Sequence, residues 1–227
     1  MLLHAKLKAK QRKLRATFPQ AFDHRIHRAL SWLGRSEREA NDKDIQFVLL
    51  WIAFNAAYAD DRDITSGTER TCFKRFLEKL VELDREGRIN QAVWDLYHEE
   101  IEHLLRNKYV FQPFWANFNG TPGYADWEVR FEKSLHQSSG ALKRRETAKV
   151  LQILFDRLYV LRNQMMHGGA TWNGSVNREQ VNFGAEVLAY ILPVVFDVML
   201  NNPKEDWGRL LYPVHRSIAQ KAPVAAG

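Results

Sequence analysis

Apolar side chains recur at intervals of three or four residues along most of this chain, and that spacing constrains its fold more than any other feature. Residues 43–59 carry the series Ile45, Val48, Leu49, Ile52 and Ala56, and residues 144–167 carry the series Leu151, Leu154, Leu158, Leu161 and Met165. Such a period turns one apolar face of an α-helix toward a core. No stretch of convincing length alternates apolar and polar residues, so the sequence predicts an all-α fold.

The helical periods and the loop signals between them predict the order of the elements. We expect helices over residues 20–38, 43–59, 68–85, 89–110, 124–137, 144–167 and 177–201. The segments DDRDITSGT, NFNGTPG and SSG interrupt the periodic stretches. Asn41 or Asp42 can cap the second helix, and Pro193 is expected to bend the last. Short connections between amphipathic helices favour an antiparallel bundle of about six to eight helices over residues 18–227.

Aromatic residues supply much of the expected core. The chain has 227 residues, 45% of them hydrophobic, with thirteen Phe and seven Trp, which is enough for a sizeable core in one domain. Trp51, Phe54 and Tyr58 widen the apolar surface of residues 43–59. We therefore expect this helix near the centre of the bundle.

The sequence also indicates a cellular setting. The longest apolar runs, FVLLWIAF and VLAYILPVVF, are shorter than the roughly 20 residues that a membrane span needs. No signal peptide is recognisable. Cys72 is the only cysteine, which excludes an intramolecular disulfide and suits a reducing compartment. We expect a soluble cytoplasmic protein with no membrane partner.

Positive charge is concentrated in residues 1–17. This segment has no acidic residue and six cations, namely Lys6, Lys8, Lys10, Arg12, Lys13 and Arg15. The other 27 basic residues equal the 27 acidic ones, so the formal net charge of +6 comes from this segment. A basic N-terminal arm binds phosphates through sequence-independent attraction, which makes the six side chains candidate RNA-binding residues. A solvated helix packed through its leucines explains the segment equally well, and the sequence leaves both interpretations open.

A polar cluster ends the apolar run of residues 144–167, in the stretch RNQMMHGG. At about 100° per residue, Arg162 lies about 40° from Leu158, at the edge of the apolar stripe. Asn163 and His167 lie about 140° and 180° from Leu158, on the solvent side. Asn163 and His167 are four residues apart and can meet. Arg162 and His167 diverge unless the helix loosens at Gly168 or a second copy of the chain supplies the missing partner.

Two interpretations fit this cluster. The first is helix termination, because a cation near a helix C-terminus interacts favourably with the dipole and Gly168 is a natural left-handed cap. The Arg-to-His spacing alone is a weak signal, since similar spacings occur at Arg130–His136 and Arg209–His215. The cluster differs from those pairs in having Asn after the Arg, an amphipathic helix before it and two glycines behind it. The second interpretation is therefore a catalytic site.

The stretch LYVLRNQMMHG resembles the HEPN superfamily, helical-bundle proteins that carry an Arg, four to six residues and a His, often with a polar residue after the Arg. The helical layout of residues 20–201 is loosely similar, and LLWIAFNAAY is similar to an early helix of larger prokaryotic members. The resemblance implies a homodimer whose two motifs face each other across a cleft, and metal-independent endoribonuclease activity. Many relatives are toxins or defend against phage, so a cognate antitoxin or defence partner is expected. Gly169 stands where one subgroup has a modified Tyr.

The chemistry suits these residues. RNA carries its own nucleophile, the 2′-hydroxyl, so cleavage needs proton transfer and charge stabilisation but neither a metal nor a cofactor. His167 can take that proton or give one to the leaving 5′-oxygen, and Arg162 can hold two phosphate oxygens with its planar fork. Asn163 can orient the imidazole or the phosphate. The alternative is a non-catalytic HEPN module that binds nucleotide, RNA or a partner protein in a larger complex.

Phe155, Tyr159 and Met166 form an apolar flank about 60° to 100° from the core stripe. This flank predicts a two-fold contact between copies near the motif.

The helix segment HEEIEH, from His98 to His103, is similar to a zinc-protease motif. Its histidines are five apart instead of four, so a solvated charged face explains it better. The indoles at Trp115, Trp127 and Trp172 lie near predicted loops and can stack on bases, although packing between helices is the simpler role.

Overall fold

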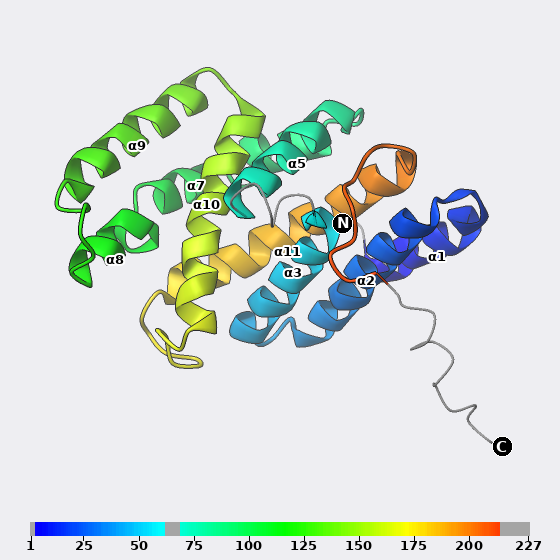
Figure 1. Ribbon diagram of the computed structural model, residues 1–227, viewed down its shortest axis with the longest axis horizontal. Helices are drawn as coiled ribbons and strands as arrows, with labels where there is room; N and C mark the ends of the chain where they lie inside the picture. The colour runs from blue at the N-terminus through cyan, green and yellow to red at the C-terminus, as the bar shows by residue number, and fades with distance from the viewer. Residues whose placement is uncertain (1–2, 62–68, 214–227) are drawn as a thin grey trace.

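The computed structural model describes residues 3–61 and 69–213, and the side chains of these residues except for 69–72. This part of the chain is all-α, as predicted, and contains no strand. Its ten α-helices exceed the predicted six to eight (Figure 1). They are α1 (His4–Leu14), α2 (Gln20–Ser36), α3 (Lys43–Tyr58), α5 (Glu69–Leu83), α6 (Arg88–Gln91), α7 (His98–Leu105), α8 (Gln112–Phe118), α9 (Trp127–Lys143), α10 (Thr147–Met166) and α11 (Arg178–Asn201).

Three departures from the predicted helices have local causes. The helix expected over 89–110 is divided into α6, a π-helical turn at Ala92–Leu96 and α7. The loop expected around NFNGTPG is preceded by α8, in which Pro113 occupies the first turn, where it costs no hydrogen bond. The segment SSG does not end α9, because Ser138 is buried and its hydroxyl donates to the carbonyl of Leu135. Most of the segment DDRDITSGT lies outside the described residues.

Buried aromatic rings join α3, α5 and α10 at the centre of the bundle. The ring of Phe54 lies 4.6 Å from that of Phe155 and 5.5 Å from that of Trp51, between centroids. The predicted central position of residues 43–59 is therefore confirmed: α3 packs against α2 and α11 and its aromatic face is fully buried. Of the two predicted candidates, Asn41 and Asp42, it is Asp42 that caps α3, since its side chain accepts from the backbone N–H of Ile45.

The apolar stripe predicted for this helix is wrong. Ile45 is 41% exposed, and the other four members of that series are half-buried. The residues that face the core are instead Phe47, Leu50, Trp51, Ala53, Phe54, Ala57 and Tyr58. Because α3 is apolar almost all round, its spacing fits more than one face, and the bulkier aromatic face is the one that is buried.

The last long helix, α11, runs through the middle of the bundle, and Pro193 lies inside it without ending it. Among the described helices it alone is long and apolar enough to cross a membrane, as judged by length and composition. Most of its apolar window is buried against other helices. Such burial is that of a core helix, and it leaves little apolar surface for lipid to contact.

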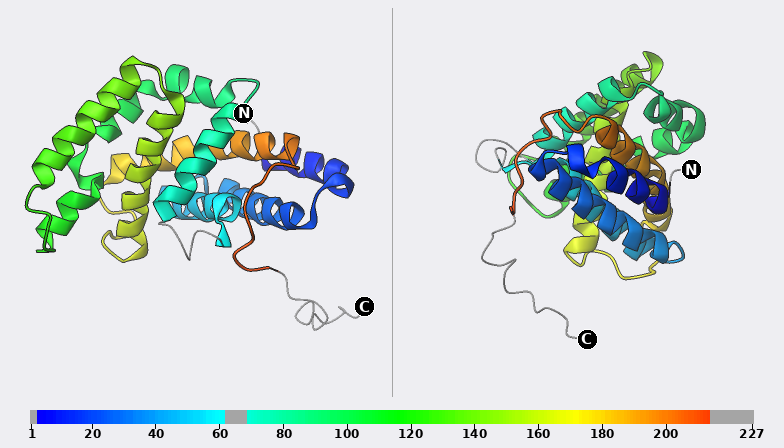
Figure 2. Two further views of the ribbon diagram at one scale, coloured as in Figure 1. Left: turned by 45° about the horizontal axis from the view of Figure 1, so that its top comes forward. Right: turned by 90° about the vertical axis from the view of Figure 1, so that its right-hand side faces the viewer.

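The basic segment at the N-terminus forms α1, which lies beside α2 and α11 at one end of the molecule (Figure 2). Leu7 and Gln11 of α1 are buried, whereas Leu3 is exposed. Leu2 lies outside the described residues. The segment is therefore a helix packed on the bundle and not an extended arm over the residues that the structure describes.

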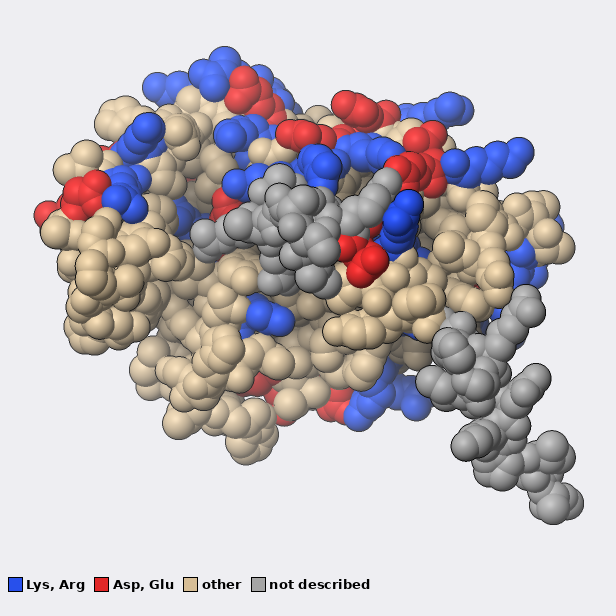
Figure 3. Space-filling view, in the orientation of Figure 1, with Lys and Arg blue, Asp and Glu red and all other residues tan. Residues whose placement is uncertain are grey.

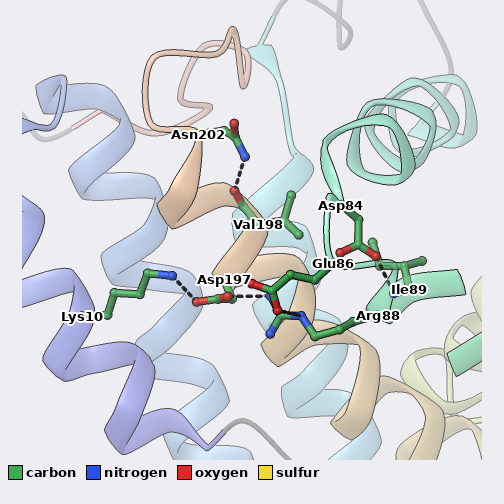
Figure 4. A network of polar contacts seen from close by, with 8 residues as sticks. All are labelled: Lys10, Asp84, Glu86, Arg88, Ile89, Asp197, Val198 and Asn202. Carbon is green, nitrogen blue, oxygen red and sulfur yellow. Dashed lines mark hydrogen bonds and ion pairs between the residues drawn. The ribbon is translucent and has the colours of Figure 1, made fainter. Parts of the chain in front are cut away.

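A polar network fastens α1 and α6 to α11 (Figure 4). The buried carboxylate of Asp197 accepts from Lys10 at 2.5 Å and from Arg88 at 2.6 Å. Burial alone would raise the pKa of this carboxyl group, but the hydrogen bonds and charges of the two cations outweigh it and leave the pKa lowered. Asp197 is therefore an ionised bridge between three helices.

Candidate active site

The stretch RNQMMHGG forms the last turn of α10 and the loop behind it. Gly168 has a φ of +71°, and its N–H donates to the carbonyl of Met165. The N–H of Gly169 donates to the carbonyl of Gln164 at 2.7 Å. These two bonds form a Schellman motif, which satisfies carbonyls that a helix end otherwise leaves unpaired. The structure thus confirms that Gly168 acts as the left-handed cap of this helix.

Arg162 and Asn163 meet at the polar edge of this turn. The Nη1 of Arg162 donates to the Oδ1 of Asn163 at 2.8 Å. The guanidinium carbon of Arg162 lies 5.9 Å from the centre of the ring of Tyr159, one turn earlier. Both motif side chains are half-buried. The amide of Asn163 and the ring of Tyr159 thus hold the arginine fork in one place.

His167 is the residue immediately after α10, and it is exposed. Its backbone N–H donates to the carbonyl of Asn163 at 3.0 Å. Its imidazole makes no hydrogen bond within the described part of the chain. The contact between Asn163 and His167 that the spacing permits is therefore not formed by their side chains. One chain brings Arg162 and Asn163 together and leaves the imidazole of His167 open to solvent.

Gln164 anchors the motif, a role that sequence reasoning missed. Its Nε2 donates to the carbonyl of Tyr109 at 2.7 Å, and its Oε1 accepts from the amide of Asn177 at 2.7 Å. The final turn of α10 is thereby tied both to the segment before α8 and to the residue before α11. In the sequence Gln164 is visible only as a polar residue inside RNQMMHGG, and nothing there indicates which groups it contacts.

The apolar flank predicted beside the motif is wrong in its first member. Phe155 is fully buried and packs against Trp51, Phe54 and Phe73. It is not a surface residue because α3 and α5 cover this side of α10, which makes the buried sector of α10 wider than the predicted stripe. Tyr159 is half-buried and Met166 is 52% exposed.

The six N-terminal cations lie on α1 and in the turn after it. Three of them contact polar groups of this chain: Lys8 with Gln11 and His27, Lys10 with Asp197, and Arg15 with Asp23. The side chains of Lys6, Arg12 and Lys13 are exposed. In Figures 1 and 2, α1 and the C-terminal end of α10 lie toward opposite ends of the molecule.

A surface cavity of about 550 Å³ lies between the turn before α3 and the loop that follows the motif. Trp172, in that loop, is exposed, and its indole N–H donates to Asp42 at 2.8 Å. Arg178 forms two hydrogen bonds with Asp44 at the same cavity, of 2.6 and 3.3 Å. The hydrogen bond from the N–H of Ile45, strengthened by that from Trp172, keeps the pKa of Asp42 low despite partial desolvation. Asp42, Asp44 and Arg178 are thus hydrogen-bonded within the chain, where they hold the loop that follows the motif.

His103 and the acidic residues near it form a separate surface. His103 lines a cavity of about 430 Å³ between α7 and α11 together with Glu99, Glu100 and Glu179. Within residues 3–61 and 69–213, no group of three or more His, Cys, Asp or Glu side chains is arranged to hold a metal ion. A surface with three carboxylates repels phosphate, so we do not place RNA there.

Comparisons with models of protein families, with curated proteins and with solved structures find no match to this chain. A function therefore has to be inferred from the residues of the chain and from their geometry.

Proposed function

We propose that this protein is a metal-independent endoribonuclease of the HEPN type. The observation that carries the proposal is the placement of Arg162, Asn163 and His167 on one accessible helix end, with the arginine fork held by the amide oxygen of Asn163 at 2.8 Å. Helix termination alone explains Gly168. It does not explain why a half-buried arginine is held by a neighbouring amide beside an exposed histidine.

The reaction follows from the chemistry of these groups. The 2′-oxygen of RNA attacks the adjacent phosphorus and loses its proton to a neutral imidazole of His167, which acts as a general base. The bond from phosphorus to the 5′-oxygen breaks, and a protonated imidazole gives its proton to that oxygen. Arg162 binds the phosphate oxygens as their charge grows. The products carry a 2′,3′-cyclic phosphate and a free 5′-hydroxyl.

The proposed enzyme acts as a homodimer. In one chain the side chains of Arg162 and Asn163 contact each other and the imidazole of His167 contacts neither. A two-fold contact at the C-terminal end of α10 supplies a second motif, so that one imidazole can accept a proton while the other donates one. We place this dimer in the cytoplasm, in a toxin–antitoxin or antiphage system whose partner restrains the activity.

A second function is favoured by one specific observation. The imidazole of His167 has no orienting partner among the described residues of its own chain, whereas catalytic histidines are usually oriented by a third group. If no second copy orients it, the protein is a non-catalytic helical module that binds nucleotide, RNA or a partner protein. Such a module still uses Arg162 to bind phosphate.

Incubation of the purified protein with single-stranded RNA in the presence of EDTA separates the two functions. The proposed enzyme cleaves RNA with EDTA present and leaves cyclic phosphate ends, which resist phosphatase until acid opens them. An oligonucleotide of the same sequence with 2′-deoxyriboses stays intact because it has no nucleophile. Absence of cleavage, or equal cleavage of the deoxy oligonucleotide, contradicts the proposal.

A further inference from the structure

Five aromatic side chains form a continuous surface at the end of the molecule that α8 and α9 occupy. We call this set the aromatic surface: Tyr109, Phe114, Trp115, Phe118 and Trp127. Phe114 is its centre, with ring centroids 5.4 Å from Tyr109, 5.2 Å from Trp115 and 5.1 Å from Trp127. Each of these three contacts is edge-to-face, which is a favourable geometry for aromatic pairs.

The aromatic surface is open to solvent. Phe118 is 71% exposed and Tyr109 is 47% exposed, while the other three rings are half-buried beneath them. Figure 3 shows a broad area without charged side chains over α8. Exposed apolar patches of this kind are uncommon on a protein surface unless something binds there. Interhelical packing, the simpler role that the sequence suggested for Trp115 and Trp127, accounts for the inner rings and leaves Phe118 unexplained.

This surface is joined directly to the motif. The carbonyl of Tyr109 accepts from the Nε2 of Gln164, in the last turn of α10, at 2.7 Å. The same carbonyl accepts from the indole N–H of Trp115 at 2.7 Å. The motif helix and the aromatic surface are therefore held in a fixed relation through one backbone oxygen.

A cation lies at the rings. The ammonium group of Lys108 lies 5.4 Å from the centre of the Tyr109 ring and 5.7 Å from that of Phe114. Lys108 is exposed and forms no ion pair with any residue that the structure describes. Arg130, which stacks on Tyr124 nearby, is already paired with Asp126. Lys108 is thus a free positive charge beside exposed aromatic faces.

We propose that the aromatic surface binds single-stranded RNA by stacking its bases on Phe118 and Tyr109, with Lys108 on the phosphate backbone. This inference rests on the proposed function and names its substrate class, an unpaired strand. Every base has a π-face, so stacking tolerates any sequence, and a positive charge beside the rings attracts the phosphates. Connection to the motif and an unpaired lysine favour RNA over a protein partner, which needs neither. Stacked bases would fix which phosphate reaches Arg162.

The test measures binding of a fluorescent single-stranded oligonucleotide with 2′-O-methyl riboses, which cannot be cleaved, to the full chain by fluorescence anisotropy. Stacking contributes roughly 1–3 kcal/mol per base, so Phe118→Ala and Tyr109→Ala should each raise Kd at least about fivefold. Phe118→Leu keeps an apolar side chain without a π-face and should weaken binding nearly as much. Tyr212→Ala is the matched control, because Tyr212 is 75% exposed and lies outside this surface.

Equal Kd values for the parent, Phe118→Ala and Tyr109→Ala overturn the inference. Full retention of binding by Phe118→Leu would also overturn it, because the surface would then be an apolar contact for a protein. Light scattering that shows a dimer dissociating in Phe118→Ala would overturn it too, because the surface would then be a contact between copies. Failure of the proposed function is distinguishable: if the oligonucleotide binds through Phe118 and unmodified RNA is not cleaved, the aromatic surface remains an RNA-binding site and the endoribonuclease is excluded.

Discussion

Gly168 is the residue on which the end of α10 depends. At a φ of +71° an L side chain is strained, by about 1 kcal/mol for alanine. Gly168→Ala should therefore lower the free energy of unfolding by about 1 kcal/mol in urea denaturation, although no atom lies within 4 Å of the added Cβ. Gly168→Asn is the matched variant and should lose less, because asparagine tolerates this backbone conformation.

Unchanged stability in Gly168→Ala would show that the turn relaxes and that the Schellman bonds contribute little. The position of His167 depends on the same turn, since its backbone N–H bonds to Asn163 just before the chain reverses. The sequence predicted the Gly-Gly stop, the exposure of His167 and a cap at Asn41 or Asp42, and the structure has all three, with the cap at Asp42. Each follows from local chemistry within a few residues.

Elements that depend on distant contacts were predicted less well. In α10 four members of the predicted stripe, Leu151, Leu154, Leu158 and Leu161, are buried, and the fifth, Met165, is half-buried. The period found this face, but the buried sector of α10 is wider and includes Phe155. In α3 nearly every side is apolar, so the period could not show which side the other helices cover. The division of residues 89–110 at a π-helical turn had no local signal, and neither did the contact of Gln164 with Tyr109. Such features arise from packing between elements.

Asp197 stabilises the contact of α1 and α6 with α11. Asp197→Asn leaves Lys10 and Arg88 without their shared carboxylate and should lower the free energy of unfolding by about 2 kcal/mol at pH 7. Because the pKa of Asp197 is lowered in the folded state, its contribution is complete well above the ordinary aspartate value of 3.8. It is lost as the pH falls through and below that value.

Urea denaturation of the parent and Asp197→Asn between pH 7 and pH 3 checks this expectation. The two proteins should differ most at neutral pH and converge in acid. Glu102→Gln is the control, because Glu102 pairs with Arg106 on the surface and such pairs contribute about 0.3–0.5 kcal/mol. A difference that stays constant with pH would show that the carboxylate is not the stabilising form.

The basic helix α1 and the C-terminal end of α10, which carries the motif, lie apart in the molecule (Figure 1). Three of the six cations in and after α1 contact other side chains of this chain. A dimer formed through the motif end leaves Lys6, Arg12 and Lys13 facing outward at both extremities. These three side chains are then free to contact RNA beyond the site or an acidic partner.

We predict that the protein is a dimer in solution. Light scattering at micromolar concentration should give a mass of twice 26.5 kDa, because the imidazole of His167 has no hydrogen-bond partner among the described residues of one chain and a two-fold contact would complete the site. Met166→Glu, at the exposed position beside the motif, should weaken the dimer and the cleavage activity together. A protein that is monomeric throughout and fully active would show that the second copy is not needed.

The proposed site is tested most directly by the single-turnover rate of RNA cleavage by His167→Ala in EDTA, measured together with the free energy of unfolding of the same variant. If His167 only follows a helix end, its replacement costs a few tenths to one kcal/mol of stability and leaves any cleavage unchanged. If it transfers a proton, the variant stays folded and cleaves at least about 10² times more slowly, as Arg162→Ala should, with Asn163→Ala between it and the parent. A folded His167→Ala that cleaves as fast as the parent would contradict the proposed site.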